Sequence, residues 1–158
     1  MENLLGPWTV QGIVKQNILA YPVEEETPIG WLATADLGKL IVAAIENPHL
    51  EPAHFQVSGL ENLTGPALAD RFSEALGRRI TYRVMPLEEF AAILDGVFGM
   101  GAGANAAQGY KFQRENADLI SMWTDMKPVL QKLPVEMTLM VDWVRQHASL
   151  LAESTRNL

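Results

Sequence analysis

The chain has 158 residues, 48% of them hydrophobic and 20% charged, which is enough to bury the core of one globular domain. Its net charge is −7, and such a surface repels a phosphate backbone, so we expect no nucleic-acid partner. The absence of cysteine excludes disulfides and zinc–thiolate sites and favours a cytoplasmic location. Neither a membrane-spanning apolar run nor a signal-peptide pattern occurs, so no membrane association is expected.

Residues 1–27 form an apolar segment followed by a strand. Residues 9–15 are either a strand or the end of a helix that begins at Asn3, and the pattern leaves both open. Residues 18–23 predict a strand. The acidic run at residues 24–26 is interpreted as a solvated loop rather than a metal site.

Residues 28–98 predict a β-α-β-α-β-α core, which opens with a short buried strand at residues 31–34. Asp36 stands where its carboxylate can cap the helix that follows, and this helix ends at Asn47-Pro48. Residues 54–58 alternate between apolar and polar side chains and predict a second strand. The helix between these strands carries an apolar stripe that is typical of a core-packed helix, formed by Leu37, Leu40, Ile41, Ala44 and Ile45.

The next helix has the clearest boundaries. Thr64 is the expected cap at its start, Pro66 stands in its first turn, and Gly77 supplies a left-handed residue at its end. Its predicted buried face consists of Leu68, Phe72, Ala75 and Leu76. Residues 79–84 then predict a strand with one solvent-exposed face, and a third helix is expected to begin at Pro86. The apolar stripe of that helix is Leu87, Phe90, Ile93, Leu94, Val97 and Phe98.

Residues 99–109 hold glycines among alanines and predict a hinge. A dinucleotide-binding loop at residues 99–103 is the alternative, but such a loop follows a strand, and here the preceding pattern is helical. Residues 110–153 predict C-terminal helices, one over 110–126, then a connector between Pro128 and Pro134, and a last helix from Thr138. The tail from Ser154 is expected to fray.

The whole chain, residues 1–158, is therefore predicted to be a single α+β domain. It is expected to contain a small mixed or parallel sheet and about four to five helices.

No pattern nominates a catalytic or metal-ligating residue. No tyrosine is followed by a lysine four residues on, no Gly-x-Ser-x-Gly elbow occurs, and the histidines lack metal-ligand spacing. His147 is interpreted as a packing residue. The tryptophans and methionines are individually typical of a core, with an apolar ligand pocket as the alternative.

Several segments, in this order along the chain, resemble the C-terminal half of the NmrA-like atypical short-chain dehydrogenases, a family of NAD(P)-binding proteins. The distinctive pieces are residues 31–38, with the pattern Trp-x-Ala-x-x-Asp-Leu-Gly, and residues 58–64, with Ser-Gly-x-Glu-x-Leu-Thr. Weaker pieces lie at residues 1–5, 18–22, 55–59, 76–78 and 138–147.

The resemblance implies a substrate-side lobe that carries the last strand or strands of a Rossmann sheet, around residue 55. It places Asn3 near the nicotinamide and substrate, and it turns Tyr21 and Phe98 toward the substrate lobe. Trp8 and Trp123 are further candidates for this substrate pocket. The glycine-rich segment that holds NADP in full-length members is missing, so we expect no cofactor for the isolated chain.

Three functions follow as hypotheses. The first is a free-standing substrate-lobe homologue that binds a small apolar or aromatic ligand and is inactive alone. The second is one part of a two-component NAD(P)H-dependent oxidoreductase, and the third is a non-catalytic regulatory or protein-interaction module. Missing strands would leave apolar faces uncovered, so we expect a homodimer through that face or a separate Rossmann-containing chain.

Overall fold

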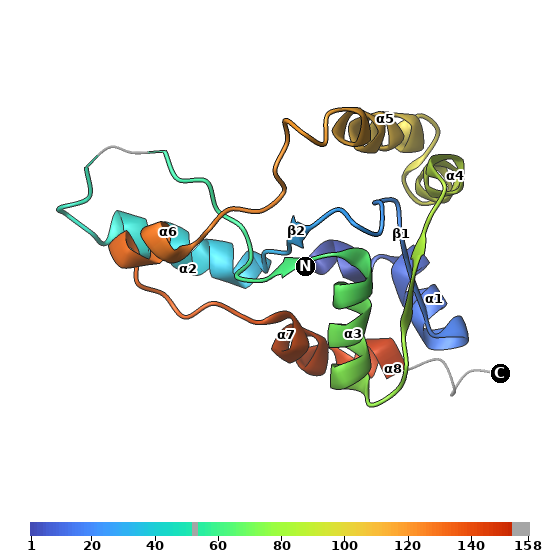
Figure 1. Cartoon of the computed structure of the whole chain (residues 1–158), viewed down its shortest axis with the longest axis horizontal. Helices are drawn as coiled ribbons and strands as arrows, with labels where there is room; N and C mark the ends of the chain where they lie inside the picture. The colour runs from blue at the N-terminus through green and yellow to red at the C-terminus, as the bar shows by residue number, and fades with distance from the viewer. Residues whose placement is uncertain (52–53, 153–158) are drawn as a thin grey trace.

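The computed structural model describes residues 1–51 and 54–152. These residues form eight α-helices, one short 3-10 helix and four strands, so the expected α+β class is confirmed with more helices than the four to five expected. Figure 1 shows the elements in space. In chain order they are η1 (Glu2–Leu5), α1 (Pro7–Gln16), β1 (Ile18–Tyr21), β2 (Ile29–Gly30), α2 (Thr34–Ile45), β3 (Asn62–Leu63), α3 (Gly65–Leu76), β4 (Thr81–Val84), α4 (Leu87–Phe98), α5 (Ala102–Glu115), α6 (Lys127–Lys132), α7 (Met140–Gln146) and α8 (Ala148–Ala152).

The N-terminal segment is helical, which decides between the two alternatives for residues 9–15. Pro7 occupies the first turn of α1, where its missing N–H leaves no hydrogen bond unmade. Asn17 ends the helix in the left-handed conformation, with φ of 57°, and turns the chain into β1. The predicted strand at residues 18–23 is confirmed as β1.

Two short sheets hold the strands. β1 pairs in parallel with β4, with Ile18 opposite Thr81 and Tyr21 opposite Val84, which agrees with the strand predicted over residues 79–84. β2 pairs with β3 in the antiparallel sense. The parallel pair requires a long crossover, and α3 forms the part of it that immediately precedes β4.

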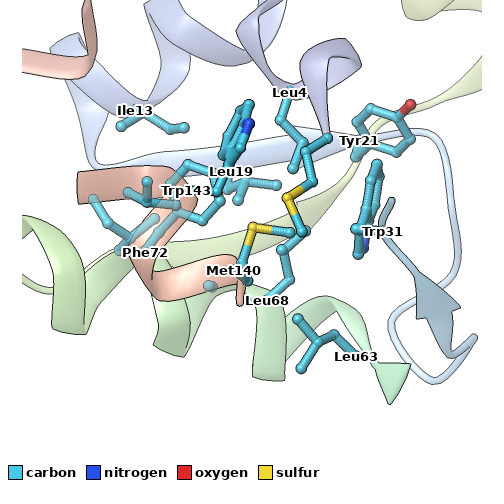
Figure 2. Packing of buried hydrophobic residues seen from close by; sticks show 14 of the residues in the cluster. Leu4, Ile13, Leu19, Tyr21, Trp31, Leu63, Leu68, Phe72, Met140 and Trp143 are labelled. Carbon is cyan, nitrogen blue, oxygen red and sulfur yellow. The ribbon is translucent and has the colours of Figure 1, made fainter. Parts of the chain in front are cut away.

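The main core lies between β1, α1, α3, α7 and α8, and Figure 2 shows its side chains from close by. Phe72 of α3 and Met140 of α7 are fully buried beside Leu19 of β1. The opposite face of β1 packs on a second, smaller cluster beneath α4 and α5, formed by Ala20, Met85, Phe90 and Leu94. β1 is therefore covered on both faces, as a parallel strand usually is.

α3 confirms its predicted boundaries. The side-chain oxygen of Thr64 accepts a hydrogen bond from the Ala67 backbone nitrogen, and Gly77 is left-handed with φ of 64°. Leu68 and Phe72 are buried as expected. These signals are local in sequence, so no tertiary contact was needed to find them.

The two strands predicted around α2 did not form where expected. β2 comes earlier, at Ile29–Gly30, and α2 already begins at Thr34, so residues 31–33 are irregular. Residues 54–58 keep the expected alternation, with Phe55 half-buried and Gln56 exposed, but they form no strand. Among the described residues no backbone ladder pairs with this segment; its end is held instead by the Ser58 hydroxyl, which donates to the Thr124 carbonyl oxygen at 3.0 Å.

The predicted core stripe of α2 is largely exposed, which corrects the sequence interpretation. Leu40 is buried, but Leu37, Ile41 and Ile45 are 38%, 52% and 78% exposed. α2 packs instead with α6, which lies beside it in Figure 1, through a cluster formed by Leu40, Met126, Val129, Leu133 and Met137. The stripe therefore has the pattern of a core helix without a surface to pack against in the described chain.

Asp36 is not the cap of α2, contrary to the prediction. Its fully buried carboxylate accepts hydrogen bonds from the Thr138 backbone nitrogen at 2.7 Å and the Thr138 hydroxyl at 3.0 Å, and Lys39 Nζ lies 2.8 Å away. The capping position is taken by Glu2, whose Oε2 accepts from the Thr34 backbone nitrogen at 3.1 Å and hydroxyl at 2.9 Å. Asp36 instead joins the first turn of α2 to the segment before α7.

The C-terminal third also differs from the prediction. α5 begins at Ala102 and ends at Glu115, so most of the expected hinge is helical and the helix expected over residues 110–126 stops early. The connector between Pro128 and Pro134 contains α6. The last helix begins at Met140 and breaks at His147, which packs against Trp143 as predicted, with ring centroids 4.4 Å apart. The tail from Ser154 lies outside the described residues.

Candidate functional site

Two tyrosines meet between β1 and α5. The hydroxyl oxygens of Tyr21 and Tyr110 are 3.0 Å apart and share a hydrogen bond. Tyr21 also packs edge-on against Trp31, with ring centroids 5.1 Å apart. The pair places two polar atoms among aromatic rings at the end of the parallel strand β1, whose last residue is Tyr21.

Both phenols of this pair are neutral at ordinary pH. Burial raises the pKa of Tyr21 well above that of a free tyrosine, and the neighbouring Tyr110 raises it further. Burial likewise raises the pKa of Tyr110. The side chain of Asn3 is close enough to act on the Tyr21 pKa in the opposite direction. The pair can therefore donate a hydrogen bond to a carbonyl-type acceptor, but it does not supply a base.

A line of aromatic rings connects the tyrosine pair to α1. Phe90 of α4 lies edge-on to Tyr110 at 5.3 Å between centroids, and Trp8 of α1 lies edge-on to Phe90 at 5.9 Å. Edge-to-face contacts of this kind add to the stability gained by burial alone. The rings fix α4 and α5 against the outer face of β1.

Trp8 borders a groove of about 450 Å³ between α1 and α4, which we call the Trp8 groove. Its apolar lining includes Ile18 and Ala20 of β1, Met85, and Ile93 and Val97 of α4. Its polar lining consists of Gln11, Lys15, Gln16, Arg83 and Glu89. Arg83 binds Glu89 through two hydrogen bonds, at 2.8 and 3.0 Å, and this contact lowers the pKa of Glu89. The groove has the size of a small-molecule site.

The five predicted pocket residues do not converge on one cavity. Asn3 and Tyr21 lie together, and the aromatic contacts connect them to Trp8. Phe98 is 69% exposed at the end of α4 and has no part in this cluster. Trp123 lies elsewhere, beside Gly30 in a surface pocket near residues 56–58. Substrate contact at these residues stays a prediction.

Sequence reasoning missed Tyr110 and Phe90 as partners of Tyr21 and Trp8. Tyr21 and Tyr110 are 89 residues apart, and no local motif joins them. Lys15 was also missed, although its place in the last turn of an amphipathic helix is a weak signal. Only the packing of α4 and α5 on β1 brings these residues together.

The glycine-rich segment does not fit a dinucleotide phosphate. The Asp95 carboxylate already accepts hydrogen bonds from the backbone nitrogens of Gly101 at 3.0 Å and Gly103 at 2.8 Å. A phosphate at this helix start would have to displace a carboxylate of the same charge. Gly103 is there for packing, since a Cβ on it would lie 2.0 Å from the Ala91 carbonyl oxygen.

No metal site is found within residues 1–51 and 54–152, since no group of three or more His, Cys, Asp or Glu side chains there is arranged to hold an ion. The acidic run at residues 24–26 is exposed, as predicted, and Glu24 pairs with Arg114 at 2.8 Å. Among the same residues no helix combines the length and apolar character that crossing a membrane requires.

Comparison with known proteins gives fold matches only. No family model and no curated protein matches the sequence. A nucleoside-diphosphate-sugar epimerase from Staphylococcus aureus matches in structure, with a TM-score of 0.70 and 22% identity over 89% of this chain. An NADPH-dependent quinone oxidoreductase from Escherichia coli gives 0.65, with 19% identity over 93% of this chain. A triphenylmethane reductase from Citrobacter gives 0.63, with 15% identity over 92% of it.

The chain has the fold of half of such a protein. It spans 48%, 51% and 48% of the lengths of these three structures. The half-length match agrees with the predicted resemblance to the C-terminal half of an NAD(P)-binding family, in that the matched structures are reductases and an epimerase.

Proposed function

We propose that the chain is the substrate-side lobe of a protein resembling NmrA-like reductases, that it binds a small apolar or aromatic ligand, and that it is inactive without a complementary half. The observation that supports this most is the extent of the fold match. Some nine-tenths of this chain overlays on solved reductases and an epimerase, yet it reaches only about half their length. A further structure of the Escherichia coli quinone oxidoreductase is described as a complex with NADPH, whereas in this chain the backbone of the glycine-rich segment binds the Asp95 carboxylate.

The Trp8 groove supports the ligand-binding part of this proposal. It is open to solvent, has an apolar floor, and is bordered by an aromatic side chain, which are the usual features of a small-molecule site. The tyrosine pair lies behind the groove, where the Phe90 ring separates Tyr110 from Trp8. A ring-shaped ligand would bury its apolar surface against Trp8 and Ile93 without displacing the Arg83–Glu89 ion pair.

The test is a set of titrations on the purified chain. NADPH alone, a naphthoquinone alone and the two together are added, while calorimetry records binding and absorbance at the nicotinamide band records turnover. The proposal expects heat from the quinone, none from NADPH, and no oxidation of NADPH. NADPH oxidation by the isolated chain would contradict it.

A two-component oxidoreductase is the second candidate, and the exposed stripe of α2 favours it. Leu37, Ile41 and Ile45 form a contiguous apolar ridge at spacing i, i+4, i+8 on the exposed side of α2. The half-buried segment at residues 54–58 offers backbone groups that a further strand would pair.

We propose that a second copy of the chain covers the apolar ridge of α2 in a homodimer when no separate Rossmann-containing chain is present.

Light scattering on the wild type and an Ile41→Glu/Ile45→Glu variant tests this proposal. The wild type is expected to be a dimer at micromolar concentration and the variant a monomer, since each glutamate places a charge on the apolar ridge. Val97→Glu/Phe98→Glu, on the exposed end of α4, serves as the matched control and is expected to leave the dimer intact. A monomeric wild type at these concentrations would contradict the dimer.

A further inference from the structure

We infer that the Trp8 groove selects flat apolar molecules that carry one anionic group, such as aryl carboxylates, and that Lys15 binds the anion. This inference rests on the proposed function, because it names the ligand class of the same site. It draws on the charges that face the groove, on its apolar floor and on the rigidity of its walls.

The charges that line the groove leave a single cation available. The lining contains two cations, Lys15 and Arg83, and one carboxylate, Glu89. Arg83 uses two guanidinium nitrogens on the two oxygens of Glu89, which neutralises both groups. Over residues 1–51 and 54–152 no carboxylate lies within ion-pair distance of Lys15.

Hydrogen-bond donors stand on the same wall as this cation. Gln11 and Gln16 line the groove from α1, within one turn of Lys15 on either side. Their side-chain amides can donate to a carboxylate that Lys15 attracts. The anion-binding groups therefore all come from the last two turns of α1, while β1 and α4 supply the apolar contacts.

The opposite side of the groove accepts rings rather than further charge. Ile18, Ala20 and Met85 form the floor, and Ile93 and Val97 form the α4 wall. Trp8 adds an aromatic surface to the groove, and Phe90 packs edge-on against the Trp8 ring.

The wall that carries Lys15 is held in place by close backbone packing. A Cβ on Gly12 would lie 2.6 Å from the Ile18 carbonyl oxygen, so α1 approaches β1 as closely as a glycine allows. Ile13, the next residue, is fully buried in the main core. A site with fixed walls loses little freedom when it binds, which favours small ligands.

The experiment compares 1-naphthoate with 1-naphthamide, which share the ring and differ in charge, by calorimetry at low salt. The wild type is expected to bind the acid about threefold to fivefold more tightly than the amide, the range for a partly exposed ion pair. Lys15→Gln is expected to remove this preference and leave the amide affinity unchanged. Lys111→Gln, which removes an exposed lysine on α5 outside the groove, is expected to retain it. Added salt is expected to weaken only the acid.

A second pair of variants locates the site. Val97→Trp places a large ring at the mouth of the groove and is expected to abolish binding of both naphthalenes, while Phe98→Trp, its exposed neighbour, is expected to leave binding intact. Equal affinity of the wild type for acid and amide, or an acid preference that survives Lys15→Gln, would overturn the inference and leave the proposed function standing. Failure of both compounds to bind would overturn the proposed function as well.

Discussion

The main core and the α2–α6 region show how one sequence pattern gives two outcomes. In α3 the apolar stripe is buried, with Phe72 fully enclosed between α7 and β1. In α2 an equally regular stripe leaves Ile41 and Ile45 more than half exposed. Periodicity therefore identifies which face of a helix is apolar, but only the rest of the fold decides whether that face is covered.

α2, which buries less apolar surface than α3, is attached to the rest of the molecule by polar contacts near its first turn. Glu2 binds Thr34, Asp36 binds Thr138, and Lys39 Nζ donates to the Glu136 carbonyl oxygen at 2.8 Å. All three attach the same end of the helix, whereas at the far end the one side-chain hydrogen bond to α6 within residues 1–51 and 54–152 is a long one, from Asn47 to the Lys132 carbonyl oxygen at 3.4 Å. α2 is thus anchored at its start and supported by α6 along one side.

The largest expected effect on stability is the difference between a truncation in the buried stripe of α3 and one in the exposed stripe of α2. Phe72→Ala is expected to lower the free energy of unfolding by about 3–5 kcal/mol, because it leaves a cavity in the main core. Ile45→Ala, on the exposed side of α2, is expected to change it by less than about 0.5 kcal/mol. Urea unfolding followed by circular dichroism measures both. Similar losses for the two variants would show that the α2 stripe is covered in solution.

The anchor of α2 gives the next largest effect. Asp36→Ala is expected to cost about 1–3 kcal/mol, since it leaves the half-buried Thr138 amide without its acceptor. Asp118→Ala, an exposed acid after α5, is the matched control and is expected to be neutral. Hydrogen exchange should show faster exchange in α2 than in α3 for the Asp36 variant only. Equal acceleration in both helices would mean that Asp36 stabilises the whole molecule rather than one region.

The tyrosine pair connects α5 to the main core more weakly. Tyr110→Phe removes the hydrogen bond between the Tyr21 and Tyr110 hydroxyls, at an expected cost of about 1 kcal/mol. The ring stays, so the edge-on contact with Phe90 persists. Thermal unfolding measures the effect, and an unchanged melting temperature would indicate that water replaces the lost partner.

The smallest effect is a pH dependence at Glu2. Burial raises the pKa of this carboxyl, but hydrogen bonds from its own backbone and from Thr34 outweigh burial and lower it to about 2. A lowered folded-state pKa means that the stabilisation is present above the ordinary value of 4.5 and is lost as the pH falls toward 2. With the side chain 44% exposed, we expect at most about 1 kcal/mol.

The pH experiment compares the wild type with Glu2→Gln. The difference between their urea midpoints should be widest near pH 6 and should close between pH 4.5 and 2 as the wild-type carboxyl takes up its proton. A difference that stays constant with pH would show that the Glu2 charge does not cap α2.

Whether an element could be predicted from the sequence depends on how far apart along the chain the residues that define it lie. α3 could be bounded from Thr64 and Gly77, because a cap and a left-handed terminus are local features. The strand expected at residues 54–58 could not be settled, because its partner would have to come from another part of a sheet. The early start of α5 depends on Asp95, which reaches from the end of α4 to cap it.

The site shows the same limit. Asn3 and Tyr21 were predicted and lie together, but Tyr110 joins them only through the packing of α5 on β1. Phe98, which the resemblance turned toward the substrate lobe, is instead exposed at the end of α4, where the apolar stripe extends beyond the surface that α4 packs on. Lys15 and Arg83 required the parallel pairing of β1 with β4 to share a groove.

The four tryptophans are intrinsic fluorescent probes that lie in different parts of the protein. Trp8 borders the groove, Trp31 and Trp143 lie in the main core, and Trp123 stands beside Gly30. In each of them the ring nitrogen is buried and donates to no partner among the described residues. Replacement by phenylalanine therefore breaks no hydrogen bond, so single-tryptophan variants can report by their emission on each neighbourhood separately while the polar network stays whole.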